Sequence, residues 1–336
     1  MPLTSLLSLL LLLFSVGCST LSTQKNCLVH RASVDLGSGA TRLRVSKINH
    51  CNNTELKLLV EKSIKIDFLE HIQENKNLIG ASFSKQAVEK LKKLLSQAES
   101  YKVDKIVVGA AGAFRKAFNA QDFLNQVKKI NEKIKLFLLD QKLEARVGYH
   151  SVNSELTNSE NGVIVWDVGG SSMQLIRKNK SNEFIYYFPE IASILFKNEL
   201  LKIQGKTMKM SPNPISSLDF KLAKKQLRNN FSKTVFFENA LKNSKKLKVI
   251  GIGGVHNYSI LAQVQKSFPL QKDSYSLAQI KESLVKRLGL RDSDIKSDYR
   301  QTEISNLIMI SVLMEIWGVD SVNLFKSNLT KGLLFL

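Results

Sequence analysis

Two short segments of the sequence share an acidic residue followed by a turn of small residues. They are VDLGSGATRLRV, which contains Asp35, and WDVGGSSMQLIR, which contains Asp167. In each segment an apolar run predicts a strand that ends near the aspartate, and the small residues predict a tight turn into a second strand. Such a turn exposes backbone N–H groups that can bind a phosphate, because glycine permits an approach that a side chain would block.

The two aspartates add an electrostatic requirement. A carboxylate beside a bound phosphate repels it unless a cation lies between them. We therefore expect Asp35 and Asp167 to bind a divalent cation, with Mg²⁺ as the best candidate, either directly or through water. A single Asp-Gly turn is usually only a hairpin turn, so the duplication is what favours a shared site.

A third cluster of glycines follows a predicted strand at residues 247–252. It contains Gly251, Gly253 and Gly254, and a helix is predicted to begin near Val255. Unpaired N–H groups and the dipole at the start of a helix attract anions. A dinucleotide-binding fingerprint would need a further glycine where His256 stands, so this cluster predicts a phosphate-binding loop and argues against a dinucleotide site.

The two aspartate segments align at one offset of 132 residues. This offset pairs Val34-Asp35-Leu36-Gly37 with Trp166-Asp167-Val168-Gly169, and it also pairs Leu43 with Leu175. With 336 residues, 43% of them hydrophobic, the chain is long enough for two globular domains. We interpret the repeat as two related domains, at residues 28–160 and 161–336, that face each other across a cleft.

Hydrophobic periodicity predicts an α/β arrangement in both halves. Three strands lead each half, and helices and strands then alternate. The helices of the first half are predicted to begin at the capping residues Ser84 and Asn119 and near Lys142. In the second half we expect helices near 190–203, 216–231 and 302–317, a capping box at Ser276 and Gln279, and a strand near 321–325.

Five stretches in this order resemble the Ppx/GppA family of exopolyphosphatases and guanosine pentaphosphate phosphohydrolases. They are VDLGSGATRLRV, VVGAAGAFRKAFNAQDFL, LDQKLEARVGYHSV, VIVWDVGGSSMQLI and VIGIGGVHNYSILA. The resemblance implies two similar domains of the actin-like ATPase (ribonuclease H-like) type with a cleft between them. It also implies metal-assisted hydrolysis of a terminal phosphoanhydride bond of polyphosphate or a related polyanion.

The resemblance assigns roles to residues that match the family's motifs. Glu144 corresponds to the catalytic carboxylate that orients or deprotonates water, and Arg115 to an arginine on the substrate phosphate. Asp35 and Asp167 correspond to the Mg²⁺ site. The expected phosphate-binding residues are Gly37, Ser38, Gly39, Gly169, Gly170, Ser171, Gly251, Gly253 and Gly254. From the sequence alone, Glu144 would be a solvent-facing helical glutamate paired with a basic neighbour; the resemblance favours catalysis.

The second loop departs from the family pattern Gly-Gly-Gly-Ser-Thr-Glu. Here Gly170 is followed by Ser171, Ser172, Met173 and Gln174, so a neutral amide replaces a carboxylate of the metal site. In the third loop Val255 stands where threonine is common. Two hypotheses follow: an active exopolyphosphatase-type enzyme, and a family member that binds polyphosphate or nucleotides without turnover.

The first residues resemble a bacterial lipoprotein signal. An apolar run from Leu6 to Val16 is too short to cross a bilayer and ends in Ser-Val-Gly-Cys. We expect a signal peptide at residues 1–18 and a lipidated Cys18 that anchors the protein to the membrane, facing the periplasm. An uncleaved anchor and a misplaced start codon remain as alternatives.

Cys27 and Cys51 test the export hypothesis, because disulfides persist only in oxidising compartments. If residues 29–36 and 41–48 form a hairpin centred on Gly39, the two cysteines lie twelve positions from the centre on either side and face each other. This arrangement predicts a disulfide. Two unrelated free thiols remain the alternative.

The net charge of +20 indicates an anionic partner. Residues 197–248 contain thirteen basic and three acidic side chains, a balance of +10, so half of the net charge lies in this stretch. We expect the stretch to lie along the cleft or its exit, or to be a solvated helical face. The sequence lacks interleaved aromatics, a zinc pattern and a reading helix, which argues against nucleic acid. A homodimer is left open.

Overall fold

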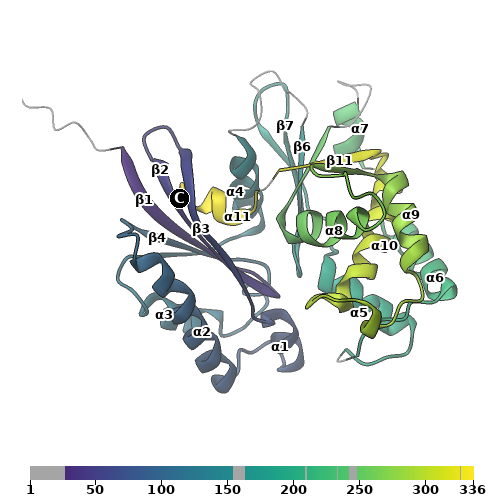
Figure 1. Ribbon diagram of the computed structural model, residues 1–336, viewed down its shortest axis with the longest axis horizontal. Helices are drawn as coiled ribbons and strands as arrows, with labels where there is room; N and C mark the ends of the chain where they lie inside the picture. Colours follow the sequence, from purple (N-terminus) through teal and green to yellow (C-terminus); the bar gives the residue numbers. More distant parts are fainter. Residues whose placement is uncertain (1–26, 154–162, 209, 233, 242–247, 326) are drawn as a thin grey trace, which may run out of the picture.

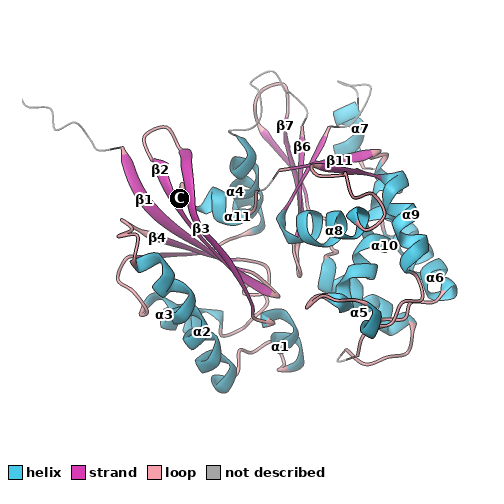
Figure 2. Cartoon of the chain, viewed as in Figure 1, coloured by secondary structure: helices cyan, strands magenta, loops and turns pink. Residues whose placement is uncertain are grey.

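The computed structural model describes residues 27–153, 163–208, 210–232, 234–241, 248–325 and 327–336. The predicted signal peptide and Cys18 lie outside these residues. The chain forms two mixed β-sheets side by side, each with helices packed against it (Figures 1 and 2). Among the described residues, none of the helices is both long and apolar enough to span a membrane.

The first sheet has the order β3-β2-β1-β4-β5. β1, β2 and β3 pair antiparallel, and β4 and β5 extend the sheet in parallel beside β1. Its strands are β1 (Leu28–Leu36), β2 (Ala40–Asn49), β3 (Thr54–Lys65), β4 (Ile106–Ala110) and β5 (Ile134–Leu138).

The second sheet repeats this plan. Its order is β10-β11-β9-β6-β7-β8, in which β8, β7, β6, β9 and β11 correspond to β3, β2, β1, β4 and β5. The strands are β6 (Ile164–Val168), β7 (Met173–Lys178), β8 (Phe184–Tyr187), β9 (Val249–Ile252), β10 (Ser274–Ser276) and β11 (Ser321–Leu324). The shared order confirms the predicted α/β fold with two similar halves.

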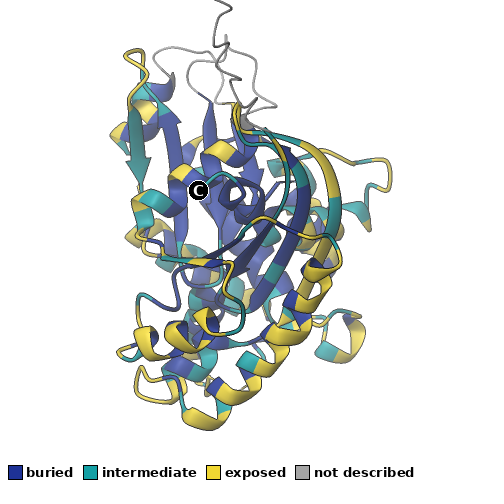
Figure 3. Ribbon diagram, turned by 90° about the vertical axis from the view of Figure 1, so that its left-hand side faces the viewer, coloured by how far each residue is buried: buried dark blue, intermediate teal, exposed yellow. Residues whose placement is uncertain are grey.

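Helices cover the outer faces of both sheets, and two helices lie between the sheets (Figure 1). α1 (Phe68–Glu74), α2 (Ala81–Glu99) and α3 (Ala120–Lys128) pack on the first sheet. The second half contributes α5 (Ser193–Ile203), α6 (Ser217–Asn230), α7 (Val235–Leu241), η1 (Val255–Ile260), α8 (Leu261–Gln265), α9 (Leu277–Arg287), η2 (Asp292–Asp294) and α10 (Arg300–Trp317). Figure 3 shows the buried residues gathered in the strands and the exposed residues on the helices.

The two helices between the sheets are α4 (Gln141–Asn153) and α11 (Leu329–Leu333). The sequence did not predict α11, which brings the C-terminus back to the first sheet. Ser33 Oγ on β1 donates to Thr330 O at 2.6 Å, and an Arg31 nitrogen donates to Leu334 O at 2.8 Å. The two halves are therefore joined by both α4 and α11.

The predicted helix caps had different outcomes. Ser276 forms the expected capping box with Gln279, and Ser216 forms one with Asp219. The prediction for Ser84 is wrong, because α2 begins at Ala81; Ser84 is buried and its hydroxyl donates to Gln126 Oε1 at 3.1 Å. Asn119 precedes α3, but its amide bonds the backbone of Ile79 and makes no cap.

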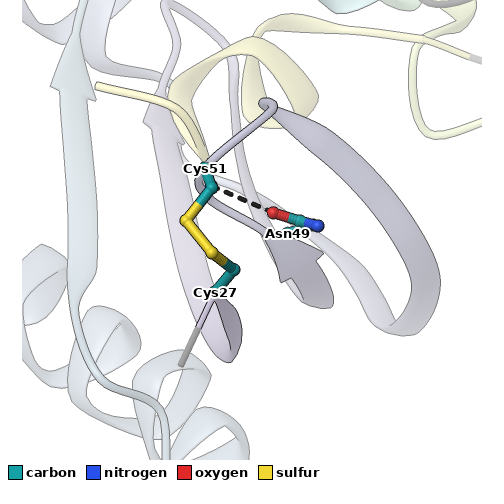
Figure 4. Close-up of a disulfide and its surroundings, with 3 residues drawn as sticks. All are labelled: Cys27, Asn49 and Cys51. Carbon is teal, nitrogen blue, oxygen red and sulfur yellow. Dashed lines mark hydrogen bonds between the residues drawn. A yellow bond between two sulfur atoms is a disulfide. The ribbon is translucent and has the colours of Figure 1, made fainter. Parts of the chain in front are cut away.

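A disulfide joins Cys27 to Cys51, with 5.4 Å between their Cα atoms (Figure 4). The predicted hairpin register is wrong by one residue. Leu36 lies opposite Thr41 and Leu28 opposite Asn49, so the strand partner of Cys27 would be residue 50. Cys51 still comes within reach because the chain turns after Asn49, whose Oδ1 accepts a hydrogen bond from Cys51 N at 3.0 Å.

The basic stretch from 197 to 248 does not form one surface along the cleft. α6, which carries several of its lysines, packs against α10 and α5 and lies at the outer edge of the second half (Figure 1). Lys224 and Arg228 both pair with Glu315 of α10, at 3.0 and 2.9 Å. Other residues of the stretch, including 242–247, lie outside the described residues.

Candidate active site

The two aspartate-glycine turns meet between the sheets. Asp35 is the second-last residue of β1 and Asp167 is the second-last residue of β6, and both side chains are buried. The turns that follow them touch directly, since Ser38 Oγ and Ser171 Oγ are 2.5 Å apart. The structure therefore brings the two predicted phosphate loops together, one from each half of the chain.

The backbone of each loop is fixed by the start of a helix. Leu69 N of α1 donates to Ser38 O, and the first two N–H groups of α5 donate to the carbonyls of Gly169 and Gly170. The turns are tight: a Cβ atom on Gly37 would lie 2.6 Å from Ala40 O, and one on Gly39 would already contact Ile194 at 3.4 Å.

The third glycine cluster closes the site from the second half. Gly253 has φ +82°, which L-residues rarely adopt, and a Cβ atom there would lie 2.5 Å from Asp167 Oδ1. A Cβ atom on Gly254 would lie 2.5 Å from Arg42 Nη2. Gly251 differs from these two, because it lies within β9 and packs against the buried ring of His256.

Glu144 lies in the first turn of α4 and is 4% exposed, so it is not a solvent-facing helical residue. Its Oε2 accepts a hydrogen bond from Arg115 Nη1 at 2.6 Å, and Ser172 Oγ donates to Oε1 at 3.4 Å. Arg115 also donates to Leu139 O at 2.8 Å, which fixes its guanidinium beside the carboxylate. The two residues expected to act on substrate are thus direct partners.

The three acids affect one another. Burial raises the pKa of Glu144, and the neighbouring Arg115 opposes this rise. Burial also raises the pKa of Asp35, against the effect of Arg42. The pKa of Asp167 is raised well above its usual value, first by burial and then by the charges of Glu144 and Asp35. Like-charge repulsion of this kind shows that the three carboxyl groups lie close enough to interact.

Arg42 is a site residue that the sequence reasoning missed. It lies directly opposite Asp35 in the β1–β2 pair, and its Nη1 is 3.4 Å from Asp35 Oδ2. At the same offset of 132 residues, Gln174 lies directly opposite Asp167 in the β6–β7 pair. The repeat itself could have identified Arg42, since it is the counterpart of a residue already singled out in the second loop.

The site fits a divalent cation for which the protein supplies only some of the ligands. Asp35 Oδ1 and Gln174 Oε1 are buried oxygen atoms with no hydrogen-bond partner among the described residues. Within that same part of the chain, no three His, Cys, Asp or Glu side chains form a complete metal-binding group. Mg²⁺ suits such a site, because it is usually held by one or two carboxylates together with water and substrate phosphates.

Residues 45–193 match the model of the Ppx/GppA phosphatase family. Over this stretch the chain is similar to the Ppx/GppA phosphatase family. The matched region contains Arg115, Glu144, Asp167 and Gln174, whereas Asp35 and the third glycine cluster lie outside it. This match supports a phosphohydrolase, and phosphatases of the Ppx/GppA family generally use divalent cations.

Solved structures of Ppx/GppA proteins share the fold over nearly the whole chain. The Aquifex aeolicus PPX-GPPA enzyme is 19% identical with a TM-score of 0.67, and the alignment covers 92% of this chain and 99% of that one. An exopolyphosphatase from Cytophaga hutchinsonii is 16% identical with a TM-score of 0.71, covering 91% and 96%. These likenesses show the two-domain actin-like ATPase fold. A search of curated proteins finds no significant match.

Proposed function

We propose that this chain hydrolyses the terminal phosphoanhydride bond of polyphosphate or a related phosphorylated polyanion. The observation that carries the proposal is the convergence of Glu144, held by Arg115, on the two aspartate-glycine loops. These residues come from both halves of the chain. The acids are buried and Arg115 is partly exposed, where a phosphate chain end would meet backbone N–H groups.

Each group has a role that follows from its position. Arg115 is 24% exposed at its side chain, so its guanidinium can receive a phosphate while it stays beside Glu144. The loop N–H groups and the Ser38 and Ser171 hydroxyls can donate to the oxygens of the transferring group. Asp167 and Gln174 would hold the cation, which when bound neutralises charge on the phosphates, whereas Asp35, also expected at the metal site, is paired with Arg42.

The reaction needs a water molecule placed in line with the bond that breaks. Glu144 accepts a proton from this water while the water oxygen forms a bond to the terminal phosphorus. The bond from that phosphorus to the bridging oxygen breaks, and the products are orthophosphate and a chain that is one phosphate shorter. Glu144 must be ionised to act, and the Arg115 guanidinium favours that form.

An exported location supports polyphosphate over cytosolic nucleotides as the substrate. The resemblance of residues 1–18 to a lipoprotein signal supports a membrane-anchored protein that faces the periplasm. The disulfide between Cys27 and Cys51 supports an oxidising compartment. Guanosine pentaphosphate and ATP are made inside the cell, where an exported protein would rarely meet them.

The test is phosphate release from a panel of polyphosphates and nucleotides, with and without Mg²⁺. Glu144→Gln should lower release by about 10²- to 10⁴-fold, which is the usual contribution of a general base. Glu303→Gln is the matched control, because Glu303 is also a buried glutamate bonded to an arginine, Arg287, at 3.1 Å, but lies outside the site.

The outcomes separate the two hypotheses for the site. Release that survives Glu144→Gln as well as Glu303→Gln would remove Glu144 as the base. Absence of release from every substrate would remove the enzymatic proposal. Binding of polyphosphate without release would then identify a protein that keeps the loops but has lost turnover.

A further inference from the structure

Gln174 is a buried amide in the site whose polar atoms are both unpaired. It is 1% exposed, and neither Oε1 nor Nε2 has a hydrogen-bond partner among the described residues. A buried polar group left unpaired destabilises the folded protein. Such a side chain is retained more readily where a ligand pairs with it.

The strand register shows where this amide is directed. Gln174 lies directly opposite Asp167 in the antiparallel β6–β7 pair, so the two side chains point to the same face of the sheet. On that face Val165 and Ile176 pack in one cluster with Ala145 of α4, the helix that carries Glu144. The Gln174 amide and the Asp167 carboxylate are therefore neighbouring oxygen donors on the face that meets Glu144.

The β1–β2 and β6–β7 hairpins differ in the charge of the residue that faces the aspartate. Asp35 faces the guanidinium of Arg42, whereas Asp167 faces a neutral amide. Arg42 also reaches the third glycine loop beside Asp167, where its Nη2 lies 2.5 Å from the Cβ position of Gly254. A free divalent cation at Asp167 would meet one charged ligand and one neutral ligand, because the nearby carboxylates of Asp35 and Glu144 are already paired with Arg42 and Arg115.

We propose that Asp167 and Gln174 bind a divalent cation only together with a phosphate chain. The protein supplies two oxygen ligands, and the phosphate oxygens supply the charge that the protein lacks. The phosphate is attracted by Arg42 and Arg115, the guanidiniums that pair with the other two carboxylates, so cation and phosphate enter as one unit. This inference rests on the proposed function, since it requires phosphate in the cleft.

Equilibrium dialysis of the purified protein tests the proposal without measuring activity. The probes are Mn²⁺ alone, imidodiphosphate alone, and both together; imidodiphosphate is a diphosphate in which nitrogen replaces the bridging oxygen. The wild-type protein should retain Mn²⁺ only when imidodiphosphate is present, at one ion per chain. Gln174→Glu should retain Mn²⁺ alone, with an affinity increased by about tenfold or more, because the affinity of a site for a divalent cation rises with the number of charged ligands.

Two further variants complete the design. Gln174→Met removes the carbonyl at similar volume, so it should retain much less Mn²⁺ even with imidodiphosphate. Gln141→Glu is the charge-matched control, because Gln141 bonds Met173 O beside this position but does not face Asp167 across the strands. It should bind Mn²⁺ as the wild type does.

Several results would overturn the proposal. Mn²⁺ retained by the wild type alone as tightly as by Gln174→Glu would show a complete metal site and leave the proposed function intact. An equal gain in Gln141→Glu would show that added charge, rather than a ligand at 174, is responsible. Cooperative unfolding shows whether Gln174→Glu is folded. If it is not, Gln174→Met provides the test, because Mn²⁺ retention equal to that of the wild type in this variant would refute the role of Gln174 as a ligand. Imidodiphosphate that never binds would overturn the proposed function as well.

Discussion

The contact between Gly253 and Asp167 gives a prediction that separates backbone strain from damage to the site. Gly253→Ala places a methyl group at φ +82°, which costs about 1–2 kcal/mol of stability in any L-residue. It also places that methyl 2.5 Å from Asp167 Oδ1, whereas ordinary contact begins at 3.4 Å. The carboxylate must therefore move by about 0.9 Å, and a displacement of about 1 Å in a catalytic site can cost about 100-fold in rate.

Gly289→Ala is the control for this prediction. Gly289 has φ +84°, so the backbone strain is the same, but nothing lies within 4 Å of its Cβ position. Both variants should lose similar stability in thermal unfolding, and only Gly253→Ala should lose about 100-fold in Mg²⁺-dependent phosphate release. Release by Gly253→Ala within about threefold of Gly289→Ala would refute the reasoning, because it would show that the position of Asp167 does not control catalysis.

Three further predictions concern charge. Burial raises the folded-state pKa of Asp167 above the ordinary 3.8, so the unfolded chain ionises first and stability falls as the pH rises through this interval. Asp167→Asn should therefore melt at a higher temperature than the wild type at pH 7 without metal, and should release no phosphate; a lower melting temperature would contradict this. Because Arg115 lowers the pKa of Glu144, Arg115→Gln should move the rising limb of the pH–rate profile to higher pH, and an unmoved limb would exclude Glu144 as the group that titrates. Lys197 is buried and its Nζ lies 2.5 Å from Oε1 of the partly exposed Glu70, so Glu70→Gln, which leaves the buried ammonium without its carboxylate, should cost about 1–3 kcal/mol in urea unfolding while Lys197→Met should be nearly neutral, and equal costs would contradict the asymmetry.

The sequence was sufficient to predict the parts of the fold that depend on local patterns. The two hairpins follow from alternating apolar residues and small turn residues, and the capping box at Ser276 follows from a serine three positions before Gln279. The repeat then predicted two similar halves, which the strand orders confirm, and the contact between Ser38 and Ser171 brings the loops of the two halves together.

Features that depend on tertiary contacts could not be predicted in the same way. Ser84 has the composition of a helix cap, but α2 begins earlier and packing on α3 recruits its hydroxyl to Gln126. The hairpin register was wrong by one residue, because a turn of small residues does not specify its own centre. The docking of α11 on β1 joins residues about 300 positions apart, and no local pattern indicates that contact.

The site carries the most informative difference between the two halves, and it is visible only when register and repeat are combined. Each half ends a strand with a buried aspartate beside a phosphate loop, and each must compensate that negative charge. The first half does so internally, through Arg42 on the neighbouring strand. The second half presents a neutral amide at the equivalent position, and burial, followed by the charges of Glu144 and Asp35, raises the pKa of Asp167 well above its usual value. Under the proposed function, the two halves therefore have different electrostatic roles. The first supplies a fixed cation that attracts phosphate, and the second supplies a carboxylate whose charge becomes favourable only when a cation arrives with the substrate.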